Sequence, residues 1–178
     1  MRFPKKRSRA ERFNALRCIP FGMDEWKAVR AEASDSQEIS DLYRTVWTAH
    51  SEIFPRELMA NRMPMADEVR EAMGNKEYYV IREGRSIVGV VRVSMDHGAC
   101  LLDRMVVHPG HRGRGIGKAL TERAIEWARE HKAEKIWLDT SPKLKDAMAL
   151  YEKMGFRECG YFRRHYWGED IKFYEMVL

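Results

Sequence analysis

The chain has 178 residues and a formal net charge of +5, a length that supplies one hydrophobic core and excludes two full-sized domains. No apolar run could cross a membrane and the first residues lack the apolar middle of a secretory signal, so we expect a cytoplasmic protein with no membrane contact. The charge is uneven, because residues 1–17 carry seven Lys or Arg against Glu11 alone.

We interpret residues 1–25 as a basic N-terminal extension and residues 26–178 as the folded domain. A basic arm can contact nucleic acid, acidic protein or a membrane surface. The alternation of basic and stacking aromatic residues that is typical of nucleic-acid binding is not found, which favours a solvated or docked extension. Cys18, Cys100 and Cys159 lie far apart, and this spacing favours buried or incidental thiols over a disulfide or a metal site.

Alternating apolar residues over Trp26–Ala33 predict a first strand. Apolar residues then recur at helical spacing over residues 39–47, behind a capping position at Asp35 or Ser36, and predict an amphipathic helix. The pattern breaks over Thr48–Met63, which we expect to be irregular.

A second helix is predicted between Pro64 and Gly74, which are typical start and stop residues. Three apolar segments with turn signals between them follow, and they predict three successive antiparallel strands. These segments are Tyr78–Arg82, Ile87–Ser94 and Ala99–Val107.

A glycine-rich loop and a helix to about Glu130 come next. The strand predicted over Lys135–Asp139 follows that helix, so it should lie parallel to the strand before the loop. A helix over Pro142–Lys153 and strands over Arg157–Trp167 and Ile171–Leu178 complete the order.

The glycine-rich loop after Val107 has the properties of an anion site. Its glycines allow backbone N–H groups to approach a ligand closely, and the helix behind it adds unpaired donors and the positive end of its dipole. A Walker A loop would need glycine at Arg112 and Ser or Thr at Ala119, and a dinucleotide fingerprint would need glycine at Lys118. Both nucleotide loops are therefore excluded, and a pyrophosphate of another kind is the expected ligand.

The pattern Arg112-x-x-Gly115-x-Gly117 behind a strand resembles the acyl-CoA signature of the GCN5-related N-acetyltransferase (GNAT) superfamily. The segment Ala147–Phe156, which reads A-x-x-L-Y-x-x-x-G-F, is similar to a late helix of the same family. The two motifs stand in the family's order with a strand between them. The resemblance implies an α/β GNAT fold over residues 26–178, with a mixed central sheet of about six to seven strands and helices on both faces.

The resemblance also implies a site for acetyl-CoA as co-substrate, without a metal. Backbone groups of the strand before the loop would bind the pantetheine arm and the acyl carbonyl, and the N–H of Val107 would stabilise the oxyanion. The loop would hold the pyrophosphate, although its cationic side chains have ordinary solvated charge as the alternative. Many relatives have asparagine, which contacts pantetheine, where this chain has Leu144; either Ser141, Thr140 or Asp146 replaces that contact or the contact is absent. The implied donor-site residues are Met105, Val106, Val107, Arg112, Gly113, Arg114, Gly115, Ile116, Gly117, Lys118, Ser141 and Tyr151.

Two catalytic roles follow from the resemblance. Tyr151 matches the tyrosine that many members use as general acid toward the leaving thiolate, with a core aromatic as its alternative role. Asp103 lies where several members place a base that takes the acceptor's proton through water, and pairing with an arginine is its equal alternative. His50 and His97, which lie on loops, are weaker candidates for this base.

The implied activity is N-acetyl transfer from acetyl-CoA to a primary amine, of a small molecule or a protein, by direct attack in a ternary complex. The alternative is a catalytically weak or inactive acyl-CoA-binding module with a regulatory or interaction role. The acceptor cannot be read from the segment Thr48–Met63, which mixes acidic and basic side chains. A homodimer through the last strands or the basic extension is compatible with the sequence.

Overall fold

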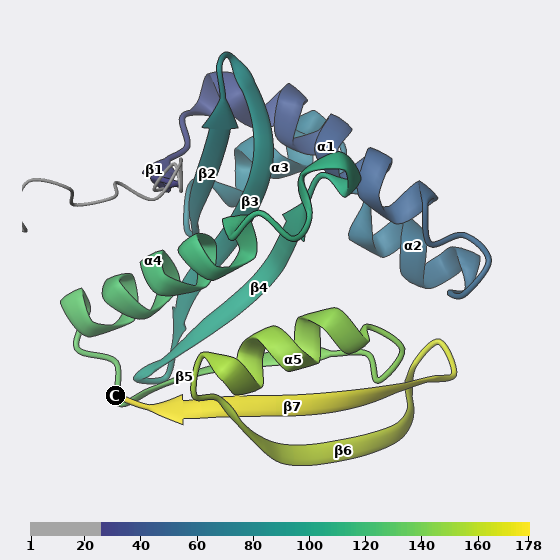
Figure 1. Cartoon of the computed structure of the whole chain (residues 1–178), viewed down its shortest axis with the longest axis vertical. Coiled ribbons are helices and arrows are strands. Elements are labelled where there is room, and N and C mark those ends of the chain that lie inside the picture. Colours follow the sequence, from purple (N-terminus) through teal and green to yellow (C-terminus); the bar gives the residue numbers. More distant parts are fainter. Residues whose placement is uncertain (1–25) are drawn as a thin grey trace, which may run out of the picture.

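The computed structural model describes residues 26–178, so the basic extension predicted over residues 1–25 lies outside the described residues. The described part forms one seven-stranded sheet of order β1-β2-β3-β4-β5-β7-β6, with helices against it (Figure 1). The strands are β1 (Val29–Arg30), β2 (Glu77–Glu83), β3 (Ser86–Asp96), β4 (Ala99–Val107), β5 (Lys135–Thr140), β6 (Arg157–Tyr166) and β7 (Glu169–Val177). The helices are α1 (Ser36–Thr48), α2 (Arg56–Arg62), α3 (Ala66–Ala72), α4 (Ile116–Glu130) and α5 (Lys145–Lys153), with short 3₁₀ turns η2 (Ala33–Asp35) and η3 (Pro109–His111).

Two hydrophobic clusters cover the two faces of the sheet. On one face α4 and α5 pack through side chains such as Leu120 and Tyr151 against β2 to β5. On the other face α1 and α3 pack through Ile39, Tyr43 and Val69. The predicted α/β fold, with a mixed sheet and helices on both faces, is confirmed. None of the helices in residues 26–178 is long and apolar enough to span a bilayer, and the cytoplasmic location stays a prediction.

Two predicted elements differ from the structure. The first strand is only Val29–Arg30, because it pairs with β2 at the sheet edge and the chain then turns into η2. The segment Thr48–Met63 is not wholly irregular, since α2 begins after Pro55 and buries Leu58. A single buried side chain is too weak a periodic signal to predict a seven-residue helix.

Strands β4 and β5 run parallel, as predicted, but they separate early. Pairing joins Ala99–Leu101 to Lys135–Trp137 and then ends, while β5 continues along β7 to Thr140. Figure 1 shows β4 and β5 diverging from their common start, with α4 over the β2–β4 half, α5 over the β5–β7 half and α2 at the open end. The separation leaves residues 102–107 of β4 without a strand partner on the β5 side; we call this the open edge of β4.

Close packing of α4 on β3 places the glycine loop at the end of β4. A Cβ on Gly89 would lie 2.6 Å from Cγ2 of Ile116 and 3.1 Å from Cδ1 of Leu120. The first turn of α4 therefore rests directly on the backbone of β3. Only glycine allows this approach.

We expect Gly89→Ala to lower the free energy of unfolding by about 1–3 kcal/mol, because the added methyl forces α4 away from β3. Urea unfolding followed by circular dichroism measures this difference. Gly160→Ala is the matched control in another strand, since its Cβ would meet Phe173 at an ordinary 3.6 Å. Equal stability losses in the two variants would contradict the packing argument.

Candidate active site

The open edge of β4 presents backbone donors at the point where the sheet divides. The amide of His108 donates to the carbonyl of Val88 on β3 at 2.9 Å. Because successive amides of a strand point to opposite sides, those of Val107 and Met105 face the open edge, whereas that of Val106 faces β3. The side chain of Val106 is buried under α1. Of the three predicted strand residues, Val107 and Met105 thus direct their amides away from β3.

A β-bulge interrupts β4 just before these residues. The pairing of β3 with β4 shifts between Val90 and Arg92, and Arg104 has a positive φ of 54°. The bulge adds one residue to the strand and keeps the side chain of Met105 on the α4 face. The hydroxyl of Tyr43 donates to the carbonyl of Arg104 at 3.0 Å and supports this strained backbone.

The glycine loop ends in unpaired amides. Gly113 and Gly115 have φ values of 75° and 86°, a conformation that favours glycine. Within residues 26–178 the amides of Gly113, Arg114 and Gly115 donate no hydrogen bond. Gly115 is also the N-cap of α4, so the first amides of the helix extend the same row of donors. This row fits a pyrophosphate, as the sequence predicts.

An ion network fixes the outer side of the loop to β2. Nη2 of Arg114 lies 2.6 Å from Oε1 of Glu83, and Nε2 of His111 lies 2.8 Å from Oε2. Hydrogen bonds from His111 and then Arg114 lower the pKa of Glu83. The carbonyl of Arg114 accepts from Trp26 Nε1 at 2.7 Å, and the Arg114 guanidinium stacks on that ring. The side chain of Arg114 is therefore already held by Glu83.

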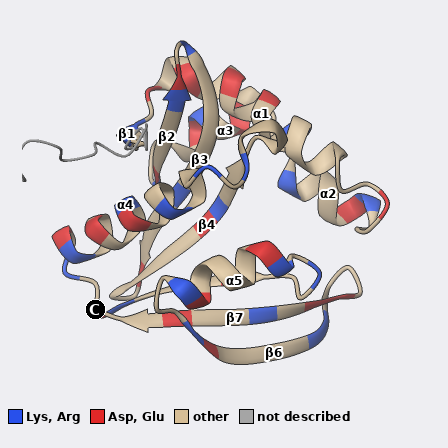
Figure 2. Cartoon of the chain, viewed as in Figure 1, with Lys and Arg blue, Asp and Glu red and all other residues tan. Residues whose placement is uncertain are grey.

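The other two loop cations have different surroundings. Nη2 of Arg112 lies 3.5 Å from Nε2 of His50, on the turn after α1. Burial, together with the charge of Arg112, lowers the pKa of His50. Lys118 pairs with Glu122 one turn further along α4, which is the solvated arrangement stated as its alternative role. Figure 2 shows basic residues along the segment between β4 and α4.

Tyr151 lies on α5 beside the same region. Its side chain is 6% exposed and belongs to the cluster under α4 and α5. Burial, reinforced by the charge of Asp139, raises the pKa of Tyr151, so the phenol keeps its proton at neutral pH. The preceding Leu150 is close to the glycine loop, because its Cδ2 would lie 3.0 Å from a Cβ on Gly117.

Asp103 makes a buried ion pair with Arg92. Nε of Arg92 donates to Oδ1 of Asp103 at 2.7 Å, and Nη2 donates to Oδ2. Each side chain is 12% exposed. Burial alone would lower the pKa of Arg92, but the hydrogen bonds and charge of Asp103 outweigh it and raise the pKa. Asp103 thus pairs with an arginine, which is the structural role given as its alternative in the sequence analysis. Its role as a base stays a prediction.

The segment between α1 and α3 bridges the two halves of the divided sheet. Its Arg62 pairs with Asp139 at the end of β5 at 3.3 Å, and both side chains are mostly buried. Its Asn61 accepts hydrogen bonds from Arg104 on β4. The carbonyl of Ile53 accepts from Lys143 at 2.8 Å.

Sequence reasoning missed Arg62, Asn61 and Asp139 as site residues. No local pattern joins positions so far apart. A run of mixed charge in a segment without periodicity was the only signal.

The remaining candidates are separated. Ser141 follows β5, is buried, and accepts a hydrogen bond from the amide of Lys143 at 3.2 Å through its hydroxyl. His97 lies in the β3–β4 turn, at the opposite end of β4 from the bulge, so the open edge is formed without it. Within residues 26–178 no group of three His, Cys, Asp or Glu side chains is arranged to hold a metal ion.

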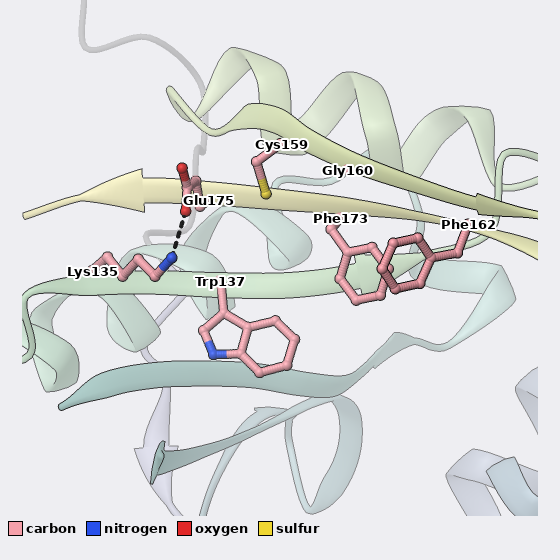
Figure 3. Close-up of a pocket in the computed structure, with 7 residues that line it drawn as sticks. All are labelled: Lys135, Trp137, Cys159, Gly160, Phe162, Phe173 and Glu175. Carbon is pink, nitrogen blue, oxygen red and sulfur yellow. Dashed lines mark hydrogen bonds and ion pairs between the residues drawn. The ribbon is translucent and has the colours of Figure 1, made fainter. Parts of the chain in front are cut away.

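A hollow on the sheet lies away from the predicted donor site. It lies on the side of β5, β7 and β6 that faces away from α5, as the alternation along β5 requires (Figure 3). Its lining residues are Lys135, Trp137, Cys159, Gly160, Phe162, Phe173 and Glu175. Tyr151 packs on the other face, so this hollow is not part of the predicted donor site.

Comparison with known proteins identifies the family. The description "Acetyltransferase (GNAT) family" belongs to a family model that matches residues 39–156 of the chain. The chain belongs to the GNAT acetyltransferase family. The matched range includes both motifs from which the resemblance was inferred, and the resemblance is confirmed.

Curated GNAT relatives match over part of their length. N-acetyltransferase 8B of Mus musculus is 34% identical over 97 residues, which are 51% of this chain and 42% of that protein. An uncharacterised N-acetyltransferase of Escherichia coli (strain K12), YjgM, is 35% identical over 88 residues, which are 47% of this chain and 53% of that protein. The chain spans about half the length of the curated relatives it matches.

Solved GNAT structures share the fold at low identity. A GNAT acetyltransferase of Streptococcus pneumoniae has a TM-score of 0.71 and 19% identity, covering 86% of this chain and 99% of that chain. YncA of Salmonella typhimurium, described as a "putative acetyltransferase" and solved with its cofactor acetyl-CoA, has a TM-score of 0.69 and 20% identity, covering 87% of this chain and 95% of that chain. These likenesses establish the fold alone.

We expect Glu83→Gln to raise amide hydrogen exchange at residues 110–115 roughly two- to tenfold, because the loop loses its ionic attachment to β2. The pKa of Glu83 is lowered in the folded protein. The attachment is therefore complete above the ordinary carboxyl pKa and is lost as the pH falls through the lower folded value.

The exchange rates are measured by mass spectrometry and corrected for intrinsic rates. Asp67→Asn, which breaks an exposed pair with Arg70 on α3, is the control and should leave the loop unchanged. Unchanged exchange at residues 110–115 in Glu83→Gln would rule out the attachment.

Proposed function

We propose that the protein transfers an acetyl group from acetyl-CoA to a primary amine by direct attack in a ternary complex. The amine nitrogen forms a bond to the acetyl carbon, the carbon–sulfur bond breaks, the nitrogen loses a proton and the departing sulfur gains one. The observation that carries this proposal is the convergence of three elements at one place. The open edge of β4, the start of α4 and α5 meet where Val107, Gly117 and Leu150 approach one another.

Acetyl-CoA fits the residues at this place. The unpaired amides from Gly113 to Gly115 would hold the pyrophosphate, aided by the dipole of α4. The amides of Met105 and Val107 would bind the pantetheine arm and the acyl carbonyl, and that of Val107 would stabilise the oxyanion. The protein thereby contributes position and fixed dipoles.

Tyr151 is the proposed proton donor to the sulfur. A thiol has a pKa of roughly 8.5, so a thiolate can leave but leaves more readily beside an O–H donor. The raised pKa of Tyr151 keeps that proton on the phenol across the physiological range. Burial among apolar side chains is compatible with this role, since it holds the ring in one orientation.

The amine's proton has two candidate acceptors. Asp103, reached through water, is the residue that the sequence predicts. His50 is the second, because its lowered pKa keeps it neutral at pH 7. Asp103 lies next to the bulge before the open edge, which supports it as the first choice.

An acyl-CoA-binding module without turnover is the alternative function. The absence of asparagine at Leu144 and the pairing of Asp103 with Arg92 favour it. Retention of Tyr151 favours the enzyme. A homodimer stays a prediction; the exposed Tyr161, Phe162 and Trp167 around β6 are apolar surface that such contact would cover.

We expect Tyr151→Phe to lower kcat by about a hundredfold with little change in the KM for acetyl-CoA, because the hydroxyl acts on the leaving sulfur. Release of free thiol from acetyl-CoA across a panel of amines measures both. Tyr161→Phe, an exposed tyrosine on β6, is the matched control and should retain activity. Tight acetyl-CoA binding with no turnover of any amine by the wild type would refute the enzyme.

The two proton acceptors are separated by Asp103→Asn and His50→Gln. We expect Asp103→Asn to lower kcat about a hundredfold across the pH range, with acetyl-CoA binding retained, and His50→Gln to keep the wild-type profile. Protonation would disable His50 as the pH falls through its pKa, below 6.5. A fall in kcat/KM in that range that disappears in His50→Gln would assign the role to His50 instead.

A further inference from the structure

The bulge in β4 turns the side chain of Arg104 toward α2, on the face of the sheet opposite α4. Residues 100 and 102 lie on the α4 face, and after the bulge so do Met105 and Val107. Arg104 is the extra residue, and its guanidinium reaches α2, where Nη1 donates to the carbonyl of Asn61 at 2.6 Å. Arg104 thus extends to the face opposite α4, while the next residue directs its amide to the open edge.

Three guanidinium groups gather here with two carboxylates. Arg92 is paired with Asp103, and Arg62 is paired with Asp139. Arg104 has no carboxylate within 4.0 Å in the described part of the chain. The cluster therefore has one uncompensated positive charge, on a partly buried side chain.

The pKa of Arg104 is consistent with one uncompensated positive charge in this cluster. Burial, and then the charges of Arg62 and Arg92, lower the pKa of Arg104. An anion brought to the guanidinium would relieve both effects. A guanidinium has five N–H donors, of which Asn61 receives two, so donors remain for a ligand.

We propose that Arg104 binds a carboxylate of the acceptor, so that the amine substrates of this enzyme are amino acids or similar small molecules that carry both an amine and a carboxylate. The inference rests on the proposed acetyl transfer. Arg104 immediately precedes Met105, whose amide faces the open edge where the acyl carbonyl would lie. A carboxylate at Arg104 would place the amine of the same small molecule beside that carbonyl. Arginine suits this role because its planar fork can donate two parallel hydrogen bonds to a carboxylate.

The test compares amino acids with their carboxamides as acceptors, by thiol release from acetyl-CoA. We expect the wild type to favour the acid over the amide by about tenfold to a hundredfold in kcat/KM. In Arg104→Gln the ratio should fall to within about twofold of unity. The amine of an amino acid and the amine of its carboxamide differ in pKa. Comparing the acid-to-amide ratio of the variant with that of the wild type cancels this difference. Loss of the contact to α2 alone would lower the rates for both acceptors and leave their ratio unchanged.

Arg56→Gln is the matched control, because Arg56 is an exposed arginine on the same α2 segment. Its acid-to-amide ratio should equal that of the wild type. If Arg104→Gln does not fold, Arg104→Lys keeps the charge without the planar fork and should lower the ratio severalfold.

Three outcomes overturn the inference. Equal turnover of acids and amides by the wild type would uphold acetyl transfer and exclude carboxylate recognition. An acid preference that persists in the Arg104 variant would assign recognition to another residue. Acetyl-CoA binding without turnover of any amine would reject the proposed function itself.

Discussion

The early separation of β4 from β5 is the constraint from which the candidate site follows. Two parallel strands that share only the pairs from Ala99–Lys135 to Leu101–Trp137 leave the rest of β4 with backbone groups that need other partners. In a continuous sheet those groups would be satisfied by β5. Here β5 does not pair with them, and a ligand with amide and carbonyl groups could do so in its place.

A divided sheet needs contacts that hold its halves together. We call the line along which β4 and β5 separate the seam. On one face of the sheet α4 and α5 cover the seam, and their side chains share one hydrophobic cluster. On the other face the segment around α2 reaches both halves, through Arg104 on β4 and through Asp139 on β5. The mostly buried pair of Arg62 with Asp139 contributes more to fixed geometry than an exposed pair such as Arg70 with Asp67, which water and salt screen.

Charge around the open edge is arranged in two different ways. On the side of the glycine loop the backbone supplies the positive end of dipoles, and the side chain of Arg114 is paired with Glu83. On the side of α2 the charges are full charges of side chains, and the carboxylates of Asp103 and Asp139 are each paired with an arginine. A group that binds there meets net positive charge, which favours an anionic substituent on the substrate. The bulge links both sides, because one inserted residue turns Arg104 toward α2 and keeps Met105 facing α4.

The amino-acid sequence by itself determined the element order, the parallel crossover and the family. The element order could be predicted because the hydrophobic periodicity is strong, as in α4, where apolar residues repeat at helical spacing. The glycines and Tyr151 could be proposed as site residues from the sequence because their expected roles depend on local backbone conformation and residue type. The first strand was predicted too long and α2 was not predicted at all, since two and seven residues carry little periodic signal.

Only the tertiary structure decided which distant residues share the site. It joined Asp103 to Arg92, where the sequence had left the arginine partner open, and it joined Arg114 to Glu83, a pair that the sequence did not indicate. It also brought Asn61, Arg62, Arg104 and Asp139 to the seam between the halves. The reason is physical: strand separation and a bulge depend on packing between elements far apart in the chain, and local propensity carries no information about either.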